Sequence, residues 1–252
     1  NEFAILYRTN AQSRSLEESL RRRNIPYKIY GGLSFYQRKE VKDLLAYFRL
    51  LINPNDEESL KRIINYPARG IGTTTIQKLI VCSRTNKVSI WECIENSFYH
   101  PRIGVNNGTL QKLKAFALMM NSFKVQLQED AFILAESIAK SSTLLKELDK
   151  DKTPEGVSRY ENVQELLNAI KEFVEKNKKV GEPHTLDYFM QDVALITDQD
   201  NDDKDNFNKV TMMTIHAAKG LEFPYVYIVG LEENLFPSQL AVHSREELEE
   251  ER

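Results

Sequence analysis

Three ionisable side chains of different types lie within seven residues late in the chain: His216, Lys219 and Glu222. Gly220 lies among them and lets the backbone turn tightly, because glycine accepts conformations that other residues avoid. An imidazole, an ammonium and a carboxylate on one tight loop are groups that can hold a ligand by hydrogen bonds and charge. The alternative interpretation is an ordinary loop between strands that carries a solvated charge pair.

Two apolar runs, Val210–Ile215 and Tyr225–Gly230, enclose this loop, and each has the length of a buried strand. Polar residues between two such runs are not there to fill a core. Open α/β sheets bind their ligands at loops that follow the carboxyl ends of strands. The loop therefore lies where a sheet of this kind carries ligand chemistry.

A second polar group, Arg8, Thr9 and Asn10, follows another apolar run, Phe3–Tyr7. A guanidinium, a hydroxyl and an amide are all suited to contacts with phosphate or sugar. Asn10 is also a good candidate for the N-cap of a helix predicted over 11–23. The alternative is that Asn10 only caps this helix and that the Arg8 side chain is solvated.

A third candidate lies within a stretch from Lys61 to Lys87 that holds six basic residues and no acidic one. Glycine backbone N–H groups, threonine hydroxyls and the start of a helix near Thr74 could grip a phosphodiester without reading bases. The segment is not a Walker A loop, because no Lys-Ser or Lys-Thr pair follows at the required spacing. The alternative is a tight turn between helices with a threonine cap. The candidate residues are Arg69, Gly70, Ile71, Gly72, Thr73, Thr74 and Thr75.

The composition describes an ordinary globular chain. Of 252 residues, 41% are hydrophobic and 28% charged, which excludes a disordered protein. No apolar run reaches the length of a membrane span, no signal-peptide pattern is present, and cytoplasm is the default location. Cys82 and Cys93 lack partner ligands at zinc-site spacing, so no metal site is expected. The net charge of −3 gives no support for nucleic-acid binding, which must rest on local charge.

The order of elements predicts a helical domain inserted into an α/β domain. Residues 1–30 and 208–252 are expected to be strand-rich and to pair in space, whereas 31–207 are expected to be almost entirely helical. Gly31 and Gly32 are a candidate hinge between them. The aromatic residues that follow, Phe35 and Tyr36, are expected in the core. The acidic segment Asp198–Asn208 is expected to be the second junction.

The loop string Thr214–Pro224, TIHAAKGLEFP, resembles motif V of superfamily 1 DNA helicases of the UvrD/PcrA/Rep type. Five further segments resemble the same family and follow its order along the chain. They are Phe3–Arg14, Tyr30–Tyr36, Arg69–Gly72, Glu232–Pro237 and Glu249–Arg252. Two residues depart from the family pattern. Relatives usually have Lys or Arg at the position of Ser34, and Gly at the position of Asn234.

The resemblance implies a fold and a role for each site. The fold would be part of the second RecA-like motor domain, a P-loop NTPase type of α/β domain, with the whole accessory domain inserted. Glu222 would approach the nucleotide ribose, Lys219 and Gly220 would shape that loop, and His216 would couple the nucleotide and DNA sites. Arg8–Asn10 would contact the single strand, and Arg69–Thr75 would face duplex DNA. The family's catalytic base belongs to the first motor domain, so no catalytic residue is expected here.

The implied parent is an ATP-dependent 3′-to-5′ DNA helicase acting in DNA repair, with ATP and Mg²⁺ bound by the parent and not tightly by this chain. The implied partners are DNA junctions, the first RecA-like domain and repair proteins, with no membrane. The chain has no Walker A or Walker B sequence and ends before motif VI would be complete, so it is expected not to hydrolyse ATP alone. Two alternatives remain: a non-catalytic regulatory or protein-binding module, and a subunit of an AddA/RecB-type helicase–nuclease.

Overall fold

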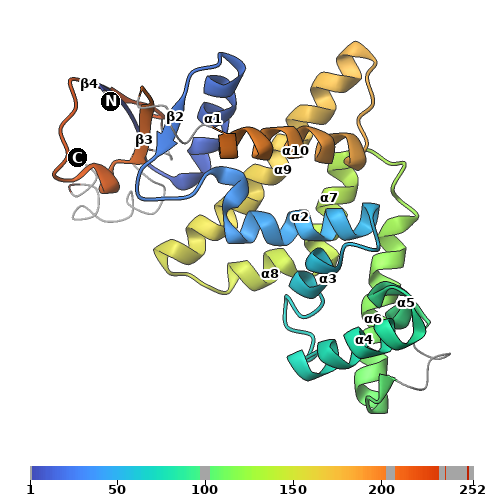
Figure 1. The fold of residues 1–252 in the computed structure, drawn as a ribbon. Coiled ribbons are helices and arrows are strands. Elements are labelled where there is room, and N and C mark those ends of the chain that lie inside the picture. The colour runs from blue at the N-terminus through green and yellow to red at the C-terminus, as the bar shows by residue number, and fades with distance from the viewer. Residues whose placement is uncertain (1, 97–102, 203–207, 233–235, 237–248, 250–252) are drawn as a thin grey trace. The chain divides into compact units, whose positions relative to one another are not determined.

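The computed structural model describes residues 2–96, 103–202, 208–232, 236 and 249 (Figure 1). The chain divides into two compact units. One consists of residues 1–38 and 196–252, and the other of residues 39–195. We call them the sheet unit and the helical unit. The chain leaves the sheet unit, forms the helical unit and returns, so the predicted insertion of a helical domain into an α/β domain is confirmed. The predicted boundaries lay at 30/31 and 207/208.

The sheet unit is built on four parallel strands in the order β2-β3-β1-β4. They are β1 (Phe3–Tyr7), β2 (Tyr27–Ile29), β3 (Val210–Thr214) and β4 (Tyr225–Ile228). Strands from the two ends of the sequence pair with one another, as the sequence predicted, and they alternate in the sheet. This arrangement is a partial RecA-like α/β fold.

The two central strands supply the buried side chains of the sheet. Ala4 and Tyr7 on β1 and Met212 and Met213 on β3 are at most 1% exposed. Central strands of a parallel sheet are covered on both faces, which is why these runs are apolar without a clear alternation. At the edge strand, the ring of Tyr225 stacks on that of Phe3 of β1, with centroids 4.9 Å apart.

The helix α1 (Ser13–Arg22), which follows the short 3₁₀ turn η1 (Asn10–Gln12), buries a polar face. Its buried residues are Ser13, Arg14 and Glu17. The predicted apolar contacts, Leu16 and Leu20, are only half-buried. Burial of these polar groups is tolerated because they are hydrogen-bonded to one another and to the segment that leaves the sheet.

The carboxylate of Glu17 is the centre of that polar face. It accepts hydrogen bonds from Ser13 Oγ (2.8 Å), from the backbone N of Phe35 (3.1 Å) and from the Tyr27 hydroxyl (3.3 Å). Arg21 lies 3.6 Å away. Burial raises the pKa of Glu17, against the opposing effects of the Ser13 hydrogen bond and the nearby arginines.

The segment after Gly32 is thereby fixed against α1. Phe35 and Tyr36, on η2 (Phe35–Gln37), are buried, which confirms their expected place in the core. Arg38 follows them and donates to Asn10 O at 2.7 Å and to Ser13 Oγ at 2.7 Å.

The helical unit contains eight complete α-helices within the described residues, and a ninth, α10, continues past residue 195. They are α2 (Lys39–Ile52), α3 (Glu57–Ile63), α4 (Thr73–Asn86), α5 (Ile90–Glu95), α6 (Asn107–Lys124), α7 (Ala131–Ser141), α8 (Leu144–Asp149), α9 (Pro154–Val180) and α10 (Leu186–Asp202). Helices α4, α5 and α6 gather at one end of this unit, and α8 lies toward the other (Figure 1).

Helix α2 forms the centre of the helical core. The predicted stripe of Val41, Leu44, Leu45 and Phe48 is fully buried, and α2 packs against α3, α6, α7 and α9. The second predicted stripe lies on α9, where Val163, Leu166 and Ile170 are also fully buried. Apolar residues at i, i+3, i+4 and i+7 share one helix face, which explains why the periodicity predicted both stripes.

Several of the sequence predictions concern residues that the structure does not describe. Helix α10 extends to Asp202, so the start of the predicted acidic junction is helical, and 203–207 lie outside the described residues. Asn234 and most residues of the segments Glu232–Pro237 and Glu249–Arg252 also lie outside the described residues. Within the described part, no helix is long and apolar enough to cross a bilayer. Cys82 and Cys93 are buried free thiols.

Candidate nucleotide and nucleic-acid sites

The carboxyl ends of β1 and β3 lie side by side, and this brings two predicted sites together. Tyr7 is in register with Thr214, and the backbone N of Ile215 donates to Tyr7 O at 2.9 Å. The residues that follow each strand, Arg8–Asn10 and His216–Glu222, therefore leave the same edge of the sheet. This is the edge at which open α/β sheets bind ligands.

The loop after β3 is short and exposed. It begins with a single 3₁₀ turn, η4 (His216–Ala218), held by a hydrogen bond from Ala217 N to Thr214 Oγ1 of 3.2 Å. His216, Lys219 and Glu222 are all exposed, and in the described part of the chain they form no ion pair with one another. They are thus available to a ligand from solvent.

Gly220 gives this loop its sharp turn. Its φ is +82°, a conformation that favours glycine, and a Cβ at this position would meet nothing within 4 Å. The glycine is required here by backbone conformation, since the space beside it is open.

The exit from β1 is organised by Gln12, whose Oε1 accepts from the backbone N of both Arg8 and Thr9 at 2.9 Å. Thr9 is the N-cap of η1, so the prediction that Asn10 caps the first helix is wrong. The side chain of Gln12 reaches back and satisfies these amides, which starts the turn one residue earlier. Arg8 and Thr9 are half-buried and Asn10 is exposed.

Gly230, two residues after β4, lies against the same glutamine. Replacing Gly230 with alanine would place a Cβ 2.0 Å from Gln12 Nε2, at a φ of +73°. We expect Gly230→Ala to displace Gln12, to weaken the sheet unit by about 1–2 kcal/mol and to accelerate amide exchange at Arg8 and Thr9. Hydrogen exchange followed by NMR would measure this.

Gly220→Ala is the matched control for that substitution. Both glycines have positive φ, but only Gly230 has a close neighbour. Exchange at Arg8 and Thr9 should therefore respond to Gly230→Ala alone. Equal effects of the two substitutions would mean that Gln12 does not hold the β1 exit.

The candidate hinge begins at the end of β2, close to the η4 turn. The backbone N of Tyr30 donates to Met212 O at 2.9 Å. Gly31 has a φ of +72°, and its Cβ position lies 3.6 Å from Ala217 Cβ. Gly32 follows and is exposed. The hinge function of Gly31 and Gly32 stays a prediction.

In the helical unit, the loop between α3 and α4 is fixed from inside by Asn65. Its Oδ1 accepts from the backbone N of Arg69 at 2.9 Å and of Ile71 at 3.0 Å. The side chain of Ile71 is fully buried. The two hydrogen bonds hold the loop in its conformation, and the buried side chain of Ile71 anchors it to the core.

Arg69 also faces inward. Its guanidinium donates to the carbonyl oxygens of Ile63 (2.8 Å), Pro67 (3.2 Å) and Ser142 (3.2 Å) and to the Tyr47 hydroxyl (2.6 Å). Burial raises the pKa of Tyr47, and the positive charge of Arg69 opposes this. These contacts make Arg69 a support of the loop.

The outer side of the loop leads into the start of α4. Gly70, Gly72, Thr73 and Thr74 are exposed there, whereas Thr75 is half-buried and its backbone N donates to Gly72 O at 3.0 Å. The helix begins after Gly72 without a side-chain cap. The first turn of an α-helix has N–H groups without partners in the helix, and these attract anions.

One residue that sequence reasoning missed lies beside this turn. Lys112, on α6, places its Nζ 3.3 Å from Gly70 O. It is far from the loop in sequence, and nothing in its local pattern distinguishes it from other exposed lysines. Only the packing of α6 within the helical unit brings it there.

The acid-free stretch contributes less free positive charge than its sequence suggests. Lys61 pairs with Glu57 and Arg62 with Asp43, and Arg69 is engaged internally. The remaining bases of the stretch, on or just after α4, are exposed and make no ion pair within the described residues. They are Lys78, Arg84 and Lys87.

The parallel sheet with a helical insertion defines a partial RecA-like domain, and comparison with known proteins gives its family. A model of the UvrD-like helicase C-terminal domain matches residues 1–252. The chain belongs to this family, as the motif resemblance predicted.

Its relatives include proteins named ATP-dependent DNA helicase PcrA. That of Staphylococcus epidermidis (strain ATCC 35984) is 41% identical over 255 residues, which is 100% of this chain and 34% of that protein. That of Bacillus subtilis (strain 168) is 40% identical over 259 residues, with the same shares covered. The chain thus spans about a third of the length of these relatives.

Proposed function

We propose that this chain is the part of an ATP-dependent 3′-to-5′ DNA helicase that binds DNA at a junction between single strand and duplex. The sheet unit would be a portion of the second motor domain, and the helical unit its inserted accessory domain. Membership of the UvrD-like family and the names of the PcrA relatives support the helicase class.

One observation carries the DNA-binding part of the proposal. The start of α4 combines exposed glycine and threonine residues of the acid-free stretch with Lys112, whose side chain reaches this loop from α6. Backbone N–H groups and hydroxyls bind phosphate oxygens, and lysines supply charge, without reading base sequence. A motor that moves along DNA requires such sequence-independent contacts.

The sheet edge supports a coupling role. Glu222 is exposed and offers carboxylate oxygens of the kind that accept from ribose hydroxyls. ATP, when bound by the whole helicase, supplies the free energy for stepping. Arg8–Asn10 follow β1, the strand beside β3. A displacement of the loop at His216 would therefore shift these residues, which in this proposal contact the single strand.

The test is fluorescence anisotropy of the chain with a labelled duplex that has a 3′ single-stranded tail. We expect binding that weakens with salt between roughly 50 and 200 mM. Lys112→Glu should reduce affinity and lower the log–log salt slope by about one unit, because one phosphate contact is lost.

Lys124→Glu is the matched control, since it makes the same charge change at the other end of α6, about 18 Å away at 1.5 Å per residue. It should alter the salt slope much less than Lys112→Glu. Equal effects of the two substitutions would show that only net charge matters and would reject the loop as a phosphate site.

A second expectation concerns hydrolysis by the chain alone. Phosphoryl transfer needs a phosphate cradle and Mg²⁺ ligands, and the sequence contains neither Walker motif. We expect no phosphate release from ATP by the purified chain, with or without DNA. A DNA-dependent rate that persists through further purification would contradict this.

A further inference from the structure

Arg38 is the last residue of the sheet unit before the chain enters the helical unit, and α2 begins at the next residue. Its residue is 7% exposed. The guanidinium donates to the backbone O of Asn10 at 2.7 Å and to Ser13 Oγ at 2.7 Å. One buried arginine thus joins the segment that leaves the sheet unit to the loop that follows β1.

The planar guanidinium gives this contact a fixed geometry. Its N–H groups form a rigid fork, so two acceptors bound together fix its orientation. The same fork donates to Leu33 O at 3.4 Å, and the guanidinium carbon lies 5.4 Å from the centroid of the Phe35 ring. The side chain is therefore held by its own segment as well as by the loop.

The loop Arg8–Asn10 is held from two sides. Gln12 Oε1 accepts from the backbone N of Arg8 and Thr9, which fixes the start of the loop from within the same turn. Arg38 fixes its end, at the carbonyl of Asn10, from 28 residues further along the chain. The backbone at Asn10 therefore depends on a residue to which no local sequence pattern connects it.

We propose that Arg38 is a positioning residue of the single-strand site. By holding the carbonyl of Asn10, it keeps the loop Arg8–Asn10 in the conformation that grips the DNA backbone, without touching the strand itself. This inference rests on the proposed contact of that loop with single-stranded DNA. The guanidinium is taken up by acceptors within the protein, so it releases no counterion when DNA binds. Its removal lowers the affinity without lowering the salt dependence.

Fluorescence anisotropy with a labelled thymidine oligonucleotide of about 15 nucleotides tests this inference. We expect Arg38→Met to weaken binding about fivefold, because the loop loses the donor that holds Asn10. The log–log salt slope should stay unchanged. Arg8→Met removes a charge from the strand contact itself, and it should lower the magnitude of that slope by about 0.7.

Duplex binding separates this effect from a general loss of structure. The proposed duplex site lies on the helical unit, so Arg38→Met should change the affinity for a blunt duplex by less than about twofold. Exchange of the buried amides of β3 reports whether the sheet unit is folded. Arg38→Lys keeps the charge but lacks the fork, and it should weaken single-strand binding about threefold with the same salt slope. This variant remains informative if Arg38→Met does not fold.

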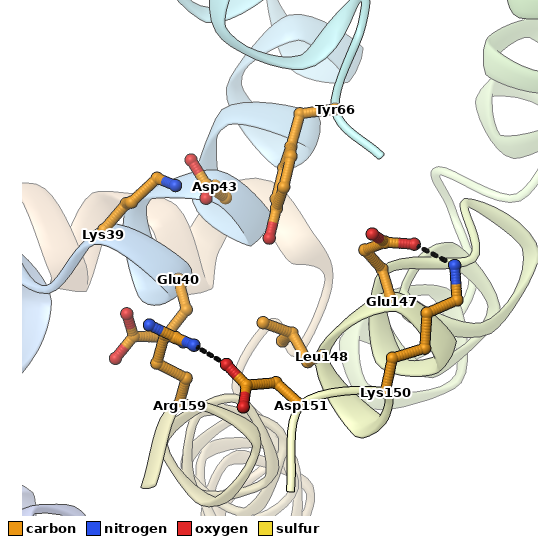
Figure 2. Close-up of a pocket in the computed structure, with 9 residues that line it drawn as sticks. All are labelled: Lys39, Glu40, Asp43, Tyr66, Glu147, Leu148, Lys150, Asp151 and Arg159. Atoms are coloured by element: carbon orange, nitrogen blue, oxygen red, sulfur yellow. Dashed lines mark hydrogen bonds and ion pairs between the residues drawn. The ribbon is translucent and has the colours of Figure 1, made fainter. Parts of the chain in front are cut away.

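Arg159→Met is the matched control, since it removes an arginine that is also engaged within the protein. Arg159 pairs with Asp151 in the lining of a cavity of about 550 Å³ in the helical unit (Figure 2). Glu147 and Lys150 of the same lining pair with each other at 2.6 Å. Neither proposed DNA site includes this cavity. Arg159→Met should therefore leave single-strand affinity unchanged.

The same contact predicts an effect in the opposite direction. Phe35 lies in the segment that Arg38 ends, and its backbone N donates to Glu17 Oε1 at 3.1 Å. Because coupling between two sites is reciprocal, a strand bound at Asn10 should stabilise this segment. We expect saturating oligonucleotide to slow amide exchange at Phe35 about threefold in the wild type and not at all in Arg38→Met.

Single-strand binding by Arg38→Met and Arg38→Lys that equals that of the wild type overturns this inference and leaves the proposed function intact. Equal losses of single-strand and duplex affinity, or equal slowing at Phe35 in wild type and Arg38→Met, overturn it as well. A lower salt slope in Arg38→Met would show that the guanidinium contacts phosphate directly, which also overturns it. A wild type that binds the duplex but no single strand overturns the single-strand part of the proposed function, and this inference with it.

Discussion

Replacing Arg69 with methionine should lower the free energy of unfolding of the helical unit by about 3 kcal/mol. The substitution removes four hydrogen bonds, to three carbonyl oxygens and the Tyr47 hydroxyl. Methionine has a similar length and keeps part of the packing, but it leaves these acceptors without donors in a partly buried place. Loss of partners for buried polar groups is among the larger single-residue effects on stability.

Urea denaturation followed by far-ultraviolet circular dichroism would measure this change, because the helical unit dominates that signal. Arg84→Met is the matched control: Arg84 is an exposed arginine on α4 that makes no ion pair within the described residues. It should change stability by less than about 0.5 kcal/mol. A loss below about 1 kcal/mol for Arg69→Met would mean that the guanidinium is mainly solvated.

The structural contacts of Arg69 also affect how DNA-binding experiments with Arg69 variants are interpreted. Arg69→Glu would weaken DNA binding by distorting the loop even if the side chain never touched a phosphate. Lys112→Glu avoids that ambiguity, since Lys112 is not part of the core. A reduction in binding by an Arg69 variant therefore needs a matching stability measurement before it can be assigned to a lost contact.

Glu17→Gln should destabilise the sheet unit by about 2 kcal/mol. The carboxylate accepts from Ser13, Tyr27 and the backbone of Phe35, and glutamine has a single acceptor oxygen and would present an amide to Arg21. The loss of stability is smaller than it would be for a carboxylate whose ionised form the surroundings favoured, because burial disfavours the ionised form of Glu17 and raises its pKa.

The cost of Glu17→Gln should also depend on pH. Because the folded-state pKa of Glu17 is raised above 4.5, the folded protein binds this proton more tightly than the unfolded chain. This tighter proton binding stabilises the folded wild type. The stabilisation is at its maximum below about pH 4.5 and is lost as the pH rises through the folded-state pKa of Glu17. The stability difference between wild type and Glu17→Gln should therefore shrink as the pH rises over that window.

Hydrogen exchange at the buried amides of β3 reports on the sheet unit separately, since two units need not unfold together. Glu2→Gln, an exposed position before β1, is the control and should change neither stability nor its pH dependence. A difference that grows with pH would show that the Glu17 carboxylate is stabilised, not penalised, by its surroundings.

The sequence predicted the elements whose pattern is set by burial. The strand β1 is a continuous apolar run, as expected of a strand covered on both faces, and the stripes of α2 and α9 follow the period of a half-buried helix. The family resemblance predicted the place of the exposed loop after β3. These predictions needed no knowledge of distant contacts.

Neither the periodicity of the sequence nor the family resemblance could predict the direction in which a side chain points. Arg69 stands in an acid-free stretch and looked like a phosphate contact, but neighbouring carbonyl groups take up its guanidinium. The buried face of α1 is polar because the segment at Phe35 returns to Glu17, a contact across eighteen residues. Lys112 reaches the loop only through helix packing. Sequence periodicity carries no information on such contacts.

The pairing of β2 with β3 has a consequence for the helical unit. The chain enters that unit after β2 and leaves it before β3, and Tyr27 lies in register with Val210. While these strands remain paired, the ends of the intervening chain cannot separate, even if every helix between them melts. The melted insert then has the restricted entropy of a closed loop, a difference of about 5 kcal/mol for a loop this long. A change that only parts these strands would thus make the helices easier to melt without touching a single helical residue.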